Sequence, residues 1–244
     1  MGETGNVARY VPHHSCQIPG LAEIYLRVFG YRTNGTFVEV GAYDGETVSN
    51  TSCLADIGWR GVYIEPVPQY AQACRDRHRA NGNVSVVQCA VGQSETPVSL
   101  HVGGVLSTSD PQMVRVYGQI DWAAGFHRGA SLVVPQRRLE AILTAEKISP
   151  GFELLVIDVE GGEEGVFAGF DLAAWRPQML IIELEDYHPS FQKFPSVVER
   201  ARRIRNMVVA NGYTEIYRDT INTVFWNDAV AKENPASHSS EKRQ

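Results

Sequence analysis

The stretch Thr36-Phe-Val-Glu-Val-Gly-Ala-Tyr-Asp-Gly-Glu46 decides the fold of this chain. Up to Val40 its residues are apolar, β-branched or aromatic apart from Glu39, which predicts a short buried strand. Gly41 follows at once, Gly45 comes next in the turn, and a helix is expected from about residue 46. A strand, a glycine turn and a helix in this order bind nucleotide-like ligands in open α/β sheets, because glycine lets the backbone approach a ligand closely.

The glycine spacing distinguishes two classes of ligand. A dinucleotide turn has the pattern G-x-G-x-x-G, whose middle glycine faces a pyrophosphate. Here Tyr43 stands at the middle position, and the acids Glu39 and Asp44 flank the turn. An acidic turn suits a cationic ligand better than a diphosphate. S-adenosylmethionine (SAM) carries a sulfonium and an ammonium group and no phosphate, so the sequence predicts SAM as the cofactor.

A second acid supports a ligand that contains ribose. Gly61-Val-Tyr-Ile-Glu65-Pro66 predicts the next strand, and Glu65 stands 20 residues after Gly45 (65 − 45 = 20). An acid at the end of that strand can accept hydrogen bonds from both ribose hydroxyls. The alternative is an ordinary βα turn with a surface glutamate.

Composition and charge limit the class of protein. The 244 residues fit one α/β domain, and a net charge of −6 makes nucleic acid a poor partner. No apolar run approaches the roughly 20 residues of a membrane span, and the N-terminus lacks a signal-peptide core. The four cysteines are scattered without a C-x-x-C pair, which predicts reduced thiols and a cytoplasmic location. The oligomeric state stays open, and a homo-oligomer is compatible with the sequence.

The remaining pattern predicts one domain with two dissimilar ends. Residues 1–34 are expected to form an N-terminal arm and a helix, residues 35–229 the α/β domain, and residues 230–244 a disordered tail. Residues 103–130 begin with a polar, glycine-rich run and then lack a clean period, which is typical of a substrate loop or lid. The aromatic residues of this segment, which suit a sugar face or an apolar ring, are Tyr117, Trp122 and Phe126.

Acids also end two later predicted strands. These are Phe152-Glu-Leu-Leu-Val-Ile-Asp158 and Pro177-Gln-Met-Leu-Ile-Ile-Glu183, whose carboxyl ends are expected at the ligand crevice. Carboxylates so placed can hold Mg²⁺, which would lower the pKa of acceptor hydroxyls, and the candidate ligands are Asp158 with Glu183 or Glu185. Glu160 and Glu163 follow the first of these strands. They can also face the crevice, or they can have the structural role of accepting hydrogen bonds that fix their loop.

The runs at 213–217 and 221–226 predict a closing antiparallel hairpin.

The chain resembles the FkbM-type SAM-dependent methyltransferases over about residues 34–228. The resemblance lies in four segments: Phe37-Val-Glu-Val-Gly-Ala-Tyr-Asp-Gly45, Tyr63-Ile-Glu-Pro66, Cys89-Ala-Val-Gly92 and Val156-Ile-Asp-Val-Glu-Gly-Gly-Glu163. Gly162 stands where the family usually has alanine. The resemblance implies a class I methyltransferase (Rossmann-like) fold: an α/β architecture with a seven-stranded, mostly parallel sheet, helices on both faces and a C-terminal antiparallel hairpin. It also implies O-methylation of a hydroxyl on a small-molecule acceptor, often a sugar or a polyketide in natural-product biosynthesis.

This interpretation assigns roles to individual residues. The cofactor-binding set is Glu39, Gly41, Ala42, Asp44 and Gly45 for the methionine half, Glu65 and Pro66 for the ribose, Cys89 and Ala90 for the adenine, and Asp158. The catalytic set is His188, Asp158, Glu160 and Glu183. His188 is the first choice for the general base because the unperturbed pKa of histidine, about 6.5, lies near working pH. Asp158 is the second choice.

Two other functions fit the same scaffold. A nicotinamide-dependent oxidoreductase would share the fold and the acid that binds ribose. Its dinucleotide turn should have a middle glycine, however, and this chain has Tyr43 there. A non-catalytic module that binds a small molecule would keep the fold without turnover, and the retained acids argue against it.

Overall fold

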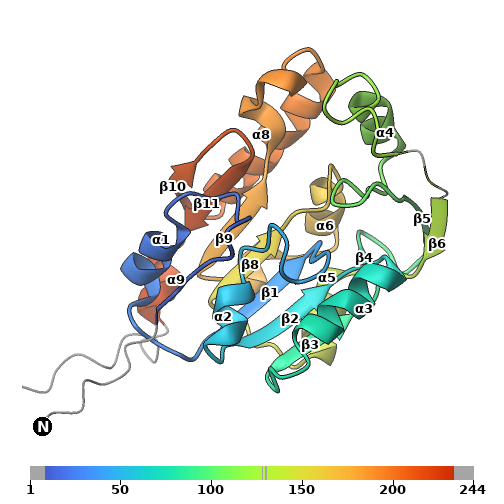
Figure 1. The fold of residues 1–244 in the computed structure, drawn as a ribbon. Coiled ribbons are helices and arrows are strands. Elements are labelled where there is room, and N and C mark those ends of the chain that lie inside the picture. Colours follow the sequence, from blue (N-terminus) through green and yellow to red (C-terminus); the bar gives the residue numbers. More distant parts are fainter. Residues whose placement is uncertain (1–8, 128, 130, 234–244) are drawn as a thin grey trace, which may run out of the picture.

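A seven-stranded sheet forms the centre of the molecule (Figure 1). The computed structural model describes residues 9–127, 129 and 131–233. The strand order is β10-β11-β9-β8-β1-β2-β3, and β11 runs antiparallel to both of its neighbours. The strands are β1 (Thr36–Val40), β2 (Arg60–Ile64), β3 (Val84–Val87), β8 (Leu154–Ile157), β9 (Met179–Glu183), β10 (Thr214–Arg218) and β11 (Asn222–Trp226). The expected class I methyltransferase sheet and its closing hairpin are confirmed.

Helices cover both faces of this sheet (Figure 1). One face packs against α1 (Leu21–Phe29), α2 (Ser52–Asp56) and α3 (Pro68–Arg77), and the other against α5 (Leu139–Ala145), α6 (Glu163–Ala168), α7 (Leu172–Trp175) and α8 (Pro195–Ala210). Side chains of β1 alternate between the two: Phe37 joins the apolar cluster under α1–α3, and Val38 and Val40 join the cluster under α5–α8. The sheet therefore has an apolar core on each side.

The strand order reverses beside β1, which has β2 on one side and β8 on the other. At their carboxyl ends β1 and β8 come very close, because the N–H of Asp158 donates to the carbonyl of Val40 at 3.0 Å. A Cβ added to Gly41 would lie 1.6 Å from the carbonyl oxygen of Asp158, and Gly41 has a φ of 91°. The sequence pattern attributes this glycine to the approach of a ligand, whereas the structure shows that the neighbouring strand end requires it.

The turn after β1 is not the expected helix. Residues 46–51 are irregular, and α2 begins only at Ser52. Asp44 accepts hydrogen bonds from the N–H groups of Glu46 and Thr47, at 2.9 and 2.7 Å, and from the Thr47 hydroxyl. Such local bonds from side chain to backbone compete with helix formation, which explains the difference.

Two small sheets lie outside the main one. Strands β4 (Ala90–Val91) and β7 (Gln136–Arg137) pair in parallel, and β5 (Val98–His101) and β6 (Ser131–Val134) pair antiparallel. Neither pair is hydrogen-bonded to the seven-stranded sheet. His101 and Ser131 are partners in the β5–β6 ladder, so both ends of the segment between them leave from one place.

That segment, of which the structure describes residues 103–127 and 129, is called the lid here. It holds α4 (Pro111–Tyr117), which sequence periodicity missed although Asp110 caps its first turn by accepting from the Gln112 N–H at 2.7 Å. Its own apolar cluster includes Met113 and Tyr117 together with Phe191 and Val197 from the region of α8. The lid is thus a packed element, and α4 lies at the α8 end of the molecule (Figure 1).

The described parts of the arm and of the C-terminal segment pack on the domain. Tyr10 and Ile18 of the arm are buried with α1 against the sheet, while residues 1–8 lie outside the described residues. Helix α9 (Asp228–Glu233) buries Val230 and Ala231, so the predicted disorder is wrong for residues 230–233. The rest of the predicted tail, residues 234–244, lies outside the described residues. No helix in the described ranges is long and apolar enough to cross a membrane.

The close approach of Gly41 to the Asp158 carbonyl gives a direct test of the fold. We expect Gly41→Ala to lower the free energy of unfolding by more than about 2 kcal/mol, because the new Cβ strains the backbone and meets the Asp158 carbonyl. Urea denaturation measures this. Gly82→Ala is the control, since a Cβ there meets open space, and its effect should lie within about 1 kcal/mol of wild type. Equal stability of the two variants would contradict this close approach.

Candidate active site

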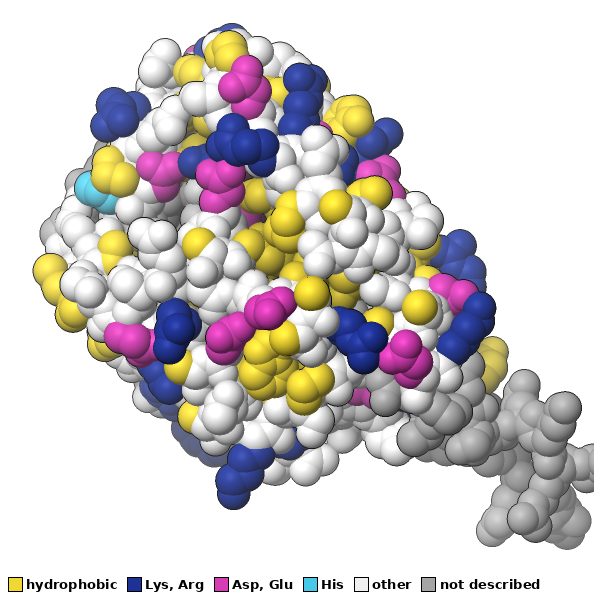
Figure 2. Space-filling view, turned by 180° about the vertical axis from the view of Figure 1, so that it is seen from behind, with side chains coloured by type: hydrophobic (Ala, Val, Ile, Leu, Met, Phe, Trp, Pro, Cys, Tyr) yellow, Lys and Arg dark blue, Asp and Glu magenta, His cyan; other side chains and the backbone are white. Residues whose placement is uncertain are grey.

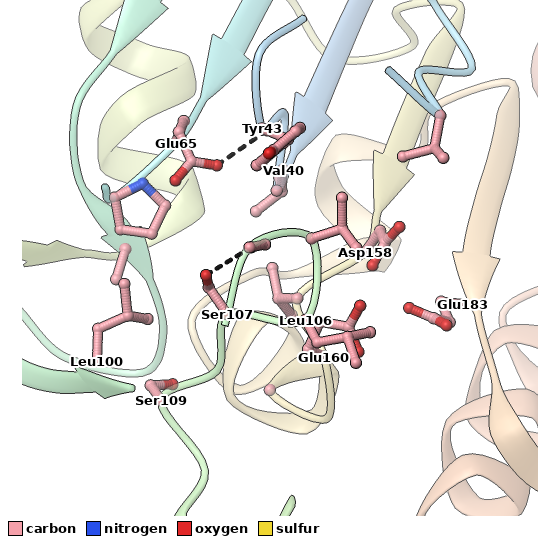
Figure 3. A pocket seen from close by; sticks show the side chains of 18 of the residues that line it. Val40, Tyr43, Glu65, Leu100, Leu106, Ser107, Ser109, Asp158, Glu160 and Glu183 are labelled. Carbon is pink, nitrogen blue, oxygen red and sulfur yellow. Dashed lines mark hydrogen bonds between the residues drawn. The ribbon is translucent and has the colours of Figure 1, made fainter. Parts of the chain in front are cut away.

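A cavity of about 230 Å³ opens at the carboxyl ends of β1, β2, β8 and β9 (Figure 3). Residues from the lid, the glycine turn and the later strand ends surround it. Of the residues assigned from the sequence, the cavity is lined by Gly41, Glu65, Pro66, Cys89, Ala90, Asp158, Glu160 and Glu183. The sequence-derived residues that do not line it are Glu39, Ala42, Asp44, Gly45 and His188.

Glu65 lies just beyond β2 on the wall of the cavity. Its carboxylate accepts hydrogen bonds from the N–H groups of Tyr43, at 2.9 Å, and Val67, at 2.8 Å (Figure 3). These bonds fix both oxygens while leaving each a further lone pair for a ligand hydroxyl. Burial raises the pKa of Glu65 to about 7, although the two N–H groups favour the charged form.

Small and apolar side chains form the neighbouring wall. Cys89 and Ala90 are buried, and Pro66, Val91 and Leu100 line the cavity beside them. A wall of this kind leaves room for a flat ring next to an acid that can hold ribose hydroxyls. The residues at the ends of β2 and β3 therefore fit the nucleoside half of SAM.

Glu39 does not face the cavity, which corrects the role expected from the sequence. Because strand side chains alternate, Glu39 points to the same face as Phe37, under α1–α3. There its carboxylate accepts hydrogen bonds from the hydroxyls of Ser49, at 3.1 Å, and Thr51. Burial raises the pKa of Glu39 to about 7. Glu39 fixes the irregular turn at 46–51, whose polar residues bind it instead of a ligand.

Three other turn residues are also structural. Asp44 caps the N–H groups of Glu46 and Thr47, Ala42 is buried, and a Cβ on Gly45 would meet Cys74 Sγ at 2.6 Å. None of the three lines the cavity. Of the turn after β1, Gly41 and Tyr43 line the cavity, and Asp158 lies beside Gly41.

Three carboxyl groups gather on the other side of the cavity (Figure 3). Asp158, Glu160 and Glu183 each offer an oxygen, and these oxygens lie within 4.8 Å of one another. Burial raises the pKa of Asp158 and, with the charge of Asp158 beside it, raises that of Glu183 further. The two carboxyl groups interact, so the pair retains a proton to a higher pH than a lone exposed carboxyl group does. The sequence suggested Asp158 with Glu183 or Glu185 as candidate Mg²⁺ ligands. In the structure Glu160, and not Glu185, lies with Asp158 and Glu183.

The lid holds Glu160 in position. Glu160 has a φ of 55°, which is rare for a residue with a Cβ. The Thr108 hydroxyl donates to its carbonyl at 2.8 Å, and the Tyr117 hydroxyl donates to its Oε2. Tyr117 is buried and stacks on His127, with ring centroids 5.4 Å apart, so it does not offer the open aromatic face expected from the sequence.

Glu163 and Glu185 lie behind the cavity and do not line it. Glu163 accepts hydrogen bonds from the N–H groups of Val159, at 3.3 Å, and Gly161, at 3.1 Å, so its role in fixing the loop agrees with the structural alternative. Burial raises the pKa of Glu185 to about 8. Arg200 offsets part of this negative charge and pairs with Asp110 of the lid at 2.6 Å.

His188 is placed beside the site and not on its wall. The short 3₁₀ helices η1 (Glu185–Tyr187) and η2 (Pro189–Phe191) turn the chain away after β9. The Nδ1 of His188 accepts from the Ser190 N–H at 3.2 Å, and its ring lies 5.9 Å from that of Trp122. Burial lowers the pKa of His188. The structure therefore favours Asp158 and Glu183 over His188 as proton acceptors.

The model of the methyltransferase FkbM domain matches residues 39–215, which include the carboxyl ends of β1, β2, β8 and β9. The chain belongs to the FkbM methyltransferase family. It is accordingly a SAM-dependent methyltransferase, and this excludes the nicotinamide oxidoreductase considered from the sequence. A comparison with curated proteins finds no match.

Solved methyltransferase structures are similar to this FkbM domain in fold. An O-methyltransferase from Bacillus cereus in complex with S-adenosylhomocysteine (SAH) is 14% identical, with a TM-score of 0.48 over 87% of this chain and 83% of that one. The O-methyltransferase TomG from Streptomyces achromogenes is 15% identical, with a TM-score of 0.41 over 79% and 72%. A precorrin-6y C5,15-methyltransferase from Geobacter metallireducens is 10% identical, with a TM-score of 0.46 over 90% and 94%. These distant likenesses carry no argument about the acceptor.

Several residues that line the cavity were not assigned a role from the sequence. They are Gln17, Val40, Tyr43, Val48, Ile64, Val91, Leu100, Gly104, Val105, Leu106, Ser107, Ser109, Val159, Gly162 and Ile221. The polar, glycine-rich start of the lid was a signal for Ser107 and Ser109, which fall within it. Gln17 and Ile221 come from the arm and the hairpin turn, and no local pattern marks them, because only the tertiary fold brings them to the cavity.

The environment of Glu39 predicts a pH dependence of stability. Its folded pKa of about 7 lies above the ordinary value of 4.5, so its stabilising contribution is present below pH 4.5 and is lost as pH rises through 7. Glu39→Gln is neutral throughout. We expect wild type to lose about 2 kcal/mol more unfolding free energy than Glu39→Gln between about pH 5.5 and pH 8. Urea denaturation at both pH values measures the difference, and parallel losses would contradict the raised pKa.

Proposed function

We propose that this methyltransferase methylates a hydroxyl group of a sugar or natural-product acceptor and so forms a methyl ether. The observation that carries this proposal is the pair of Asp158 and Glu183, which faces the cavity opposite the nucleoside wall and whose pKa values are raised. An alcohol must lose its proton as it is methylated, and a carboxyl pair of raised pKa is suited to accept it near neutral pH.

The roles divide along the cavity. Glu65 would hold the ribose hydroxyls, and the small residues at the ends of β2 and β3 would flank the adenine. SAM, when bound, supplies a methyl group activated by its sulfonium sulfur. A carboxylate of the Asp158 and Glu183 pair would accept the proton of the acceptor hydroxyl, whose oxygen takes the methyl group. Correct alignment of the hydroxyl is the main contribution of the lid.

The acceptor is proposed to be a small molecule rather than a nucleic acid. On the face of the molecule in Figure 2, basic and acidic side chains are interspersed, so that face offers no continuous basic surface for a phosphate backbone.

The four cysteines carry free thiols, and we keep the cytoplasm as the proposed location on that ground. The same three carboxylates are candidate Mg²⁺ ligands, and this is the second role we consider for them.

The ribose role of Glu65 predicts a specific kinetic change. Glu65→Ala should weaken SAH binding and raise the KM for SAM by at least about tenfold, because two hydrogen bonds to a charged group are lost. Its kcat should fall much less, since Glu65 lies away from the reacting atoms. Titration calorimetry with SAH and steady-state kinetics measure the two effects. Glu164→Ala, which removes an exposed acid, should change neither. Equal losses in KM and kcat would place Glu65 outside the ribose site.

The choice of base predicts a ranking of variants. Asp158→Asn and Glu183→Gln should each lower kcat by about 10²–10⁴, the usual contribution of a general base. His188→Ala should lower it by much less, because His188 is not on the cavity wall. The assay is transfer of a labelled methyl group from SAM to the first alcohol that a screen identifies. A loss in His188→Ala as large as in the carboxyl variants would restore His188 as the base.

A further inference from the structure

The cavity wall carries negative charge only. In the part of the chain that the structure describes, its lining includes Glu65, Asp158, Glu160 and Glu183 and no lysine, arginine or histidine. Glu65 is satisfied by two backbone N–H groups. The excess of unneutralised carboxyl groups therefore lies at the far end of the cavity, opposite the nucleoside wall.

Glu183 is the least satisfied of these acids. Its Oε2 is buried and receives no hydrogen bond from an N–H or hydroxyl donor of the described residues. The side chain points toward Asp158 and Glu160 (Figure 3). Only a proton shared with Asp158 or an added cation can satisfy this oxygen, because a buried carboxylate without a partner is strongly unfavourable.

Arg200, whose charge opposes the rise in the pKa of Glu185, belongs to another network. Arg200 pairs with Asp110 at 2.6 Å and lies behind Gly161, where a Cβ would meet its Nη2 at 2.7 Å. It is not a lining residue. No basic side chain of the described residues lines the cavity, so a proton or a cationic ligand must neutralise the three carboxyl groups on the cavity side.

The carboxyl group of Glu160 is held ready for such a ligand. The Tyr117 hydroxyl fixes Oε2, and the Thr108 hydroxyl fixes the backbone carbonyl of a residue with a positive φ. Both donors come from the lid, which also places Trp122 and Phe126 on the cavity wall with half or nearly half of each side chain exposed. Aromatic faces and hydroxyls beside acids suit a polar ring that carries a cationic group.

The three oxygens are close enough together to surround one cation. Three oxygens bonded to one ammonium group at about 2.8 Å lie about 4.6 Å apart, since its N–H bonds are tetrahedral. The oxygens of Asp158, Glu160 and Glu183 all lie within 4.8 Å of one another, so they can surround one ammonium group. The aromatic rings and hydroxyls of the lid beside them suit an organic cation rather than a bare metal ion.

We propose that the three carboxyl groups of Asp158, Glu160 and Glu183 form a subsite for an ammonium group, so that the acceptor is an amino alcohol such as an amino sugar. This inference rests on the proposed O-methylation and names its substrate class. The ammonium group lies among the three carboxyl groups, and the hydroxyl beside it is the one that is methylated. Acceptors that carry phosphate or carboxylate are excluded by the same charges.

The test compares matched acceptors on the protein saturated with SAH. Glucosamine, galactosamine and trans-2-aminocyclohexanol are each titrated beside their N-acetyl derivatives. We expect each amine that binds to bind at least about tenfold more tightly than its acetylated partner, because acetylation removes the charge. Glu183→Gln and Glu160→Gln should abolish this preference. Glu185→Gln is the matched control: it is also a buried glutamate with an unpartnered oxygen, but it does not line the cavity, and it should keep the preference.

Several results would overturn the proposal. They are equal binding of amines and acetylated partners, no binding of any amine up to its solubility limit, and a methylated product that carries the methyl group on nitrogen. Mn²⁺ binding, detected by electron paramagnetic resonance and lost in Glu183→Gln, would assign the subsite to a metal instead. SAH binding is measured first and separately: SAH binding without amine preference refutes this inference alone, and absence of SAH binding refutes the proposed function as well.

Discussion

The contact between the ends of β1 and β8 is the constraint on which the site depends. Gly41 passes so close to the Asp158 carbonyl that no side chain fits between them. This contact fixes the turn after β1 against the acid after β8. The cavity opens beside this point, where the strand order reverses. In the proposed function, this contact joins the cofactor wall (Glu65, Cys89 and Ala90) to the acceptor wall (Asp158, Glu160 and Glu183).

The acids of the domain differ in the groups that donate hydrogen bonds to them. Glu39 has the hydroxyls of Ser49 and Thr51, and Glu65 and Glu163 have backbone N–H groups. Asp186 pairs with Arg205 at 2.7 Å. In the pair of Asp158 and Glu183, the Oε2 of Glu183 receives no hydrogen bond from an N–H or hydroxyl donor of the described residues, and the pair faces the cavity. Acids with fixed donors serve the structure, whereas an acid pair that lacks them can exchange its proton or bind a cation.

The sequence predicts the sheet and half of the site for clear physical reasons. Apolar runs that end in an acid, such as those before Glu65, Asp158 and Glu183, mark parallel strands whose carboxyl ends must meet. The orientation of Glu39 was predictable in principle, because strand alternation puts it on the face of Phe37, but its place in the motif suggested a ligand. The capping role of Asp44 is also local and was overlooked.

The rest of the site depends on tertiary contacts that no local pattern reports. The Tyr117 hydroxyl reaches Glu160 because the lid folds back on the end of β8, and the two residues are far apart in the chain. His188 follows β9 closely in sequence, yet two 3₁₀ turns carry it off the cavity wall. Gln17 and Ile221 reach the cavity from opposite ends of the chain.

The most direct measurement is a crystal structure of the protein with SAH. The account predicts that the ribose hydroxyls of SAH lie within hydrogen-bond distance of Glu65, that the adenine packs on Ala90 and Cys89, and that the sulfur faces Asp158 and Glu183. SAH bound with its ribose away from Glu65, or with its sulfur on the side opposite Asp158, would contradict the division of this cavity into a cofactor wall and an acceptor wall.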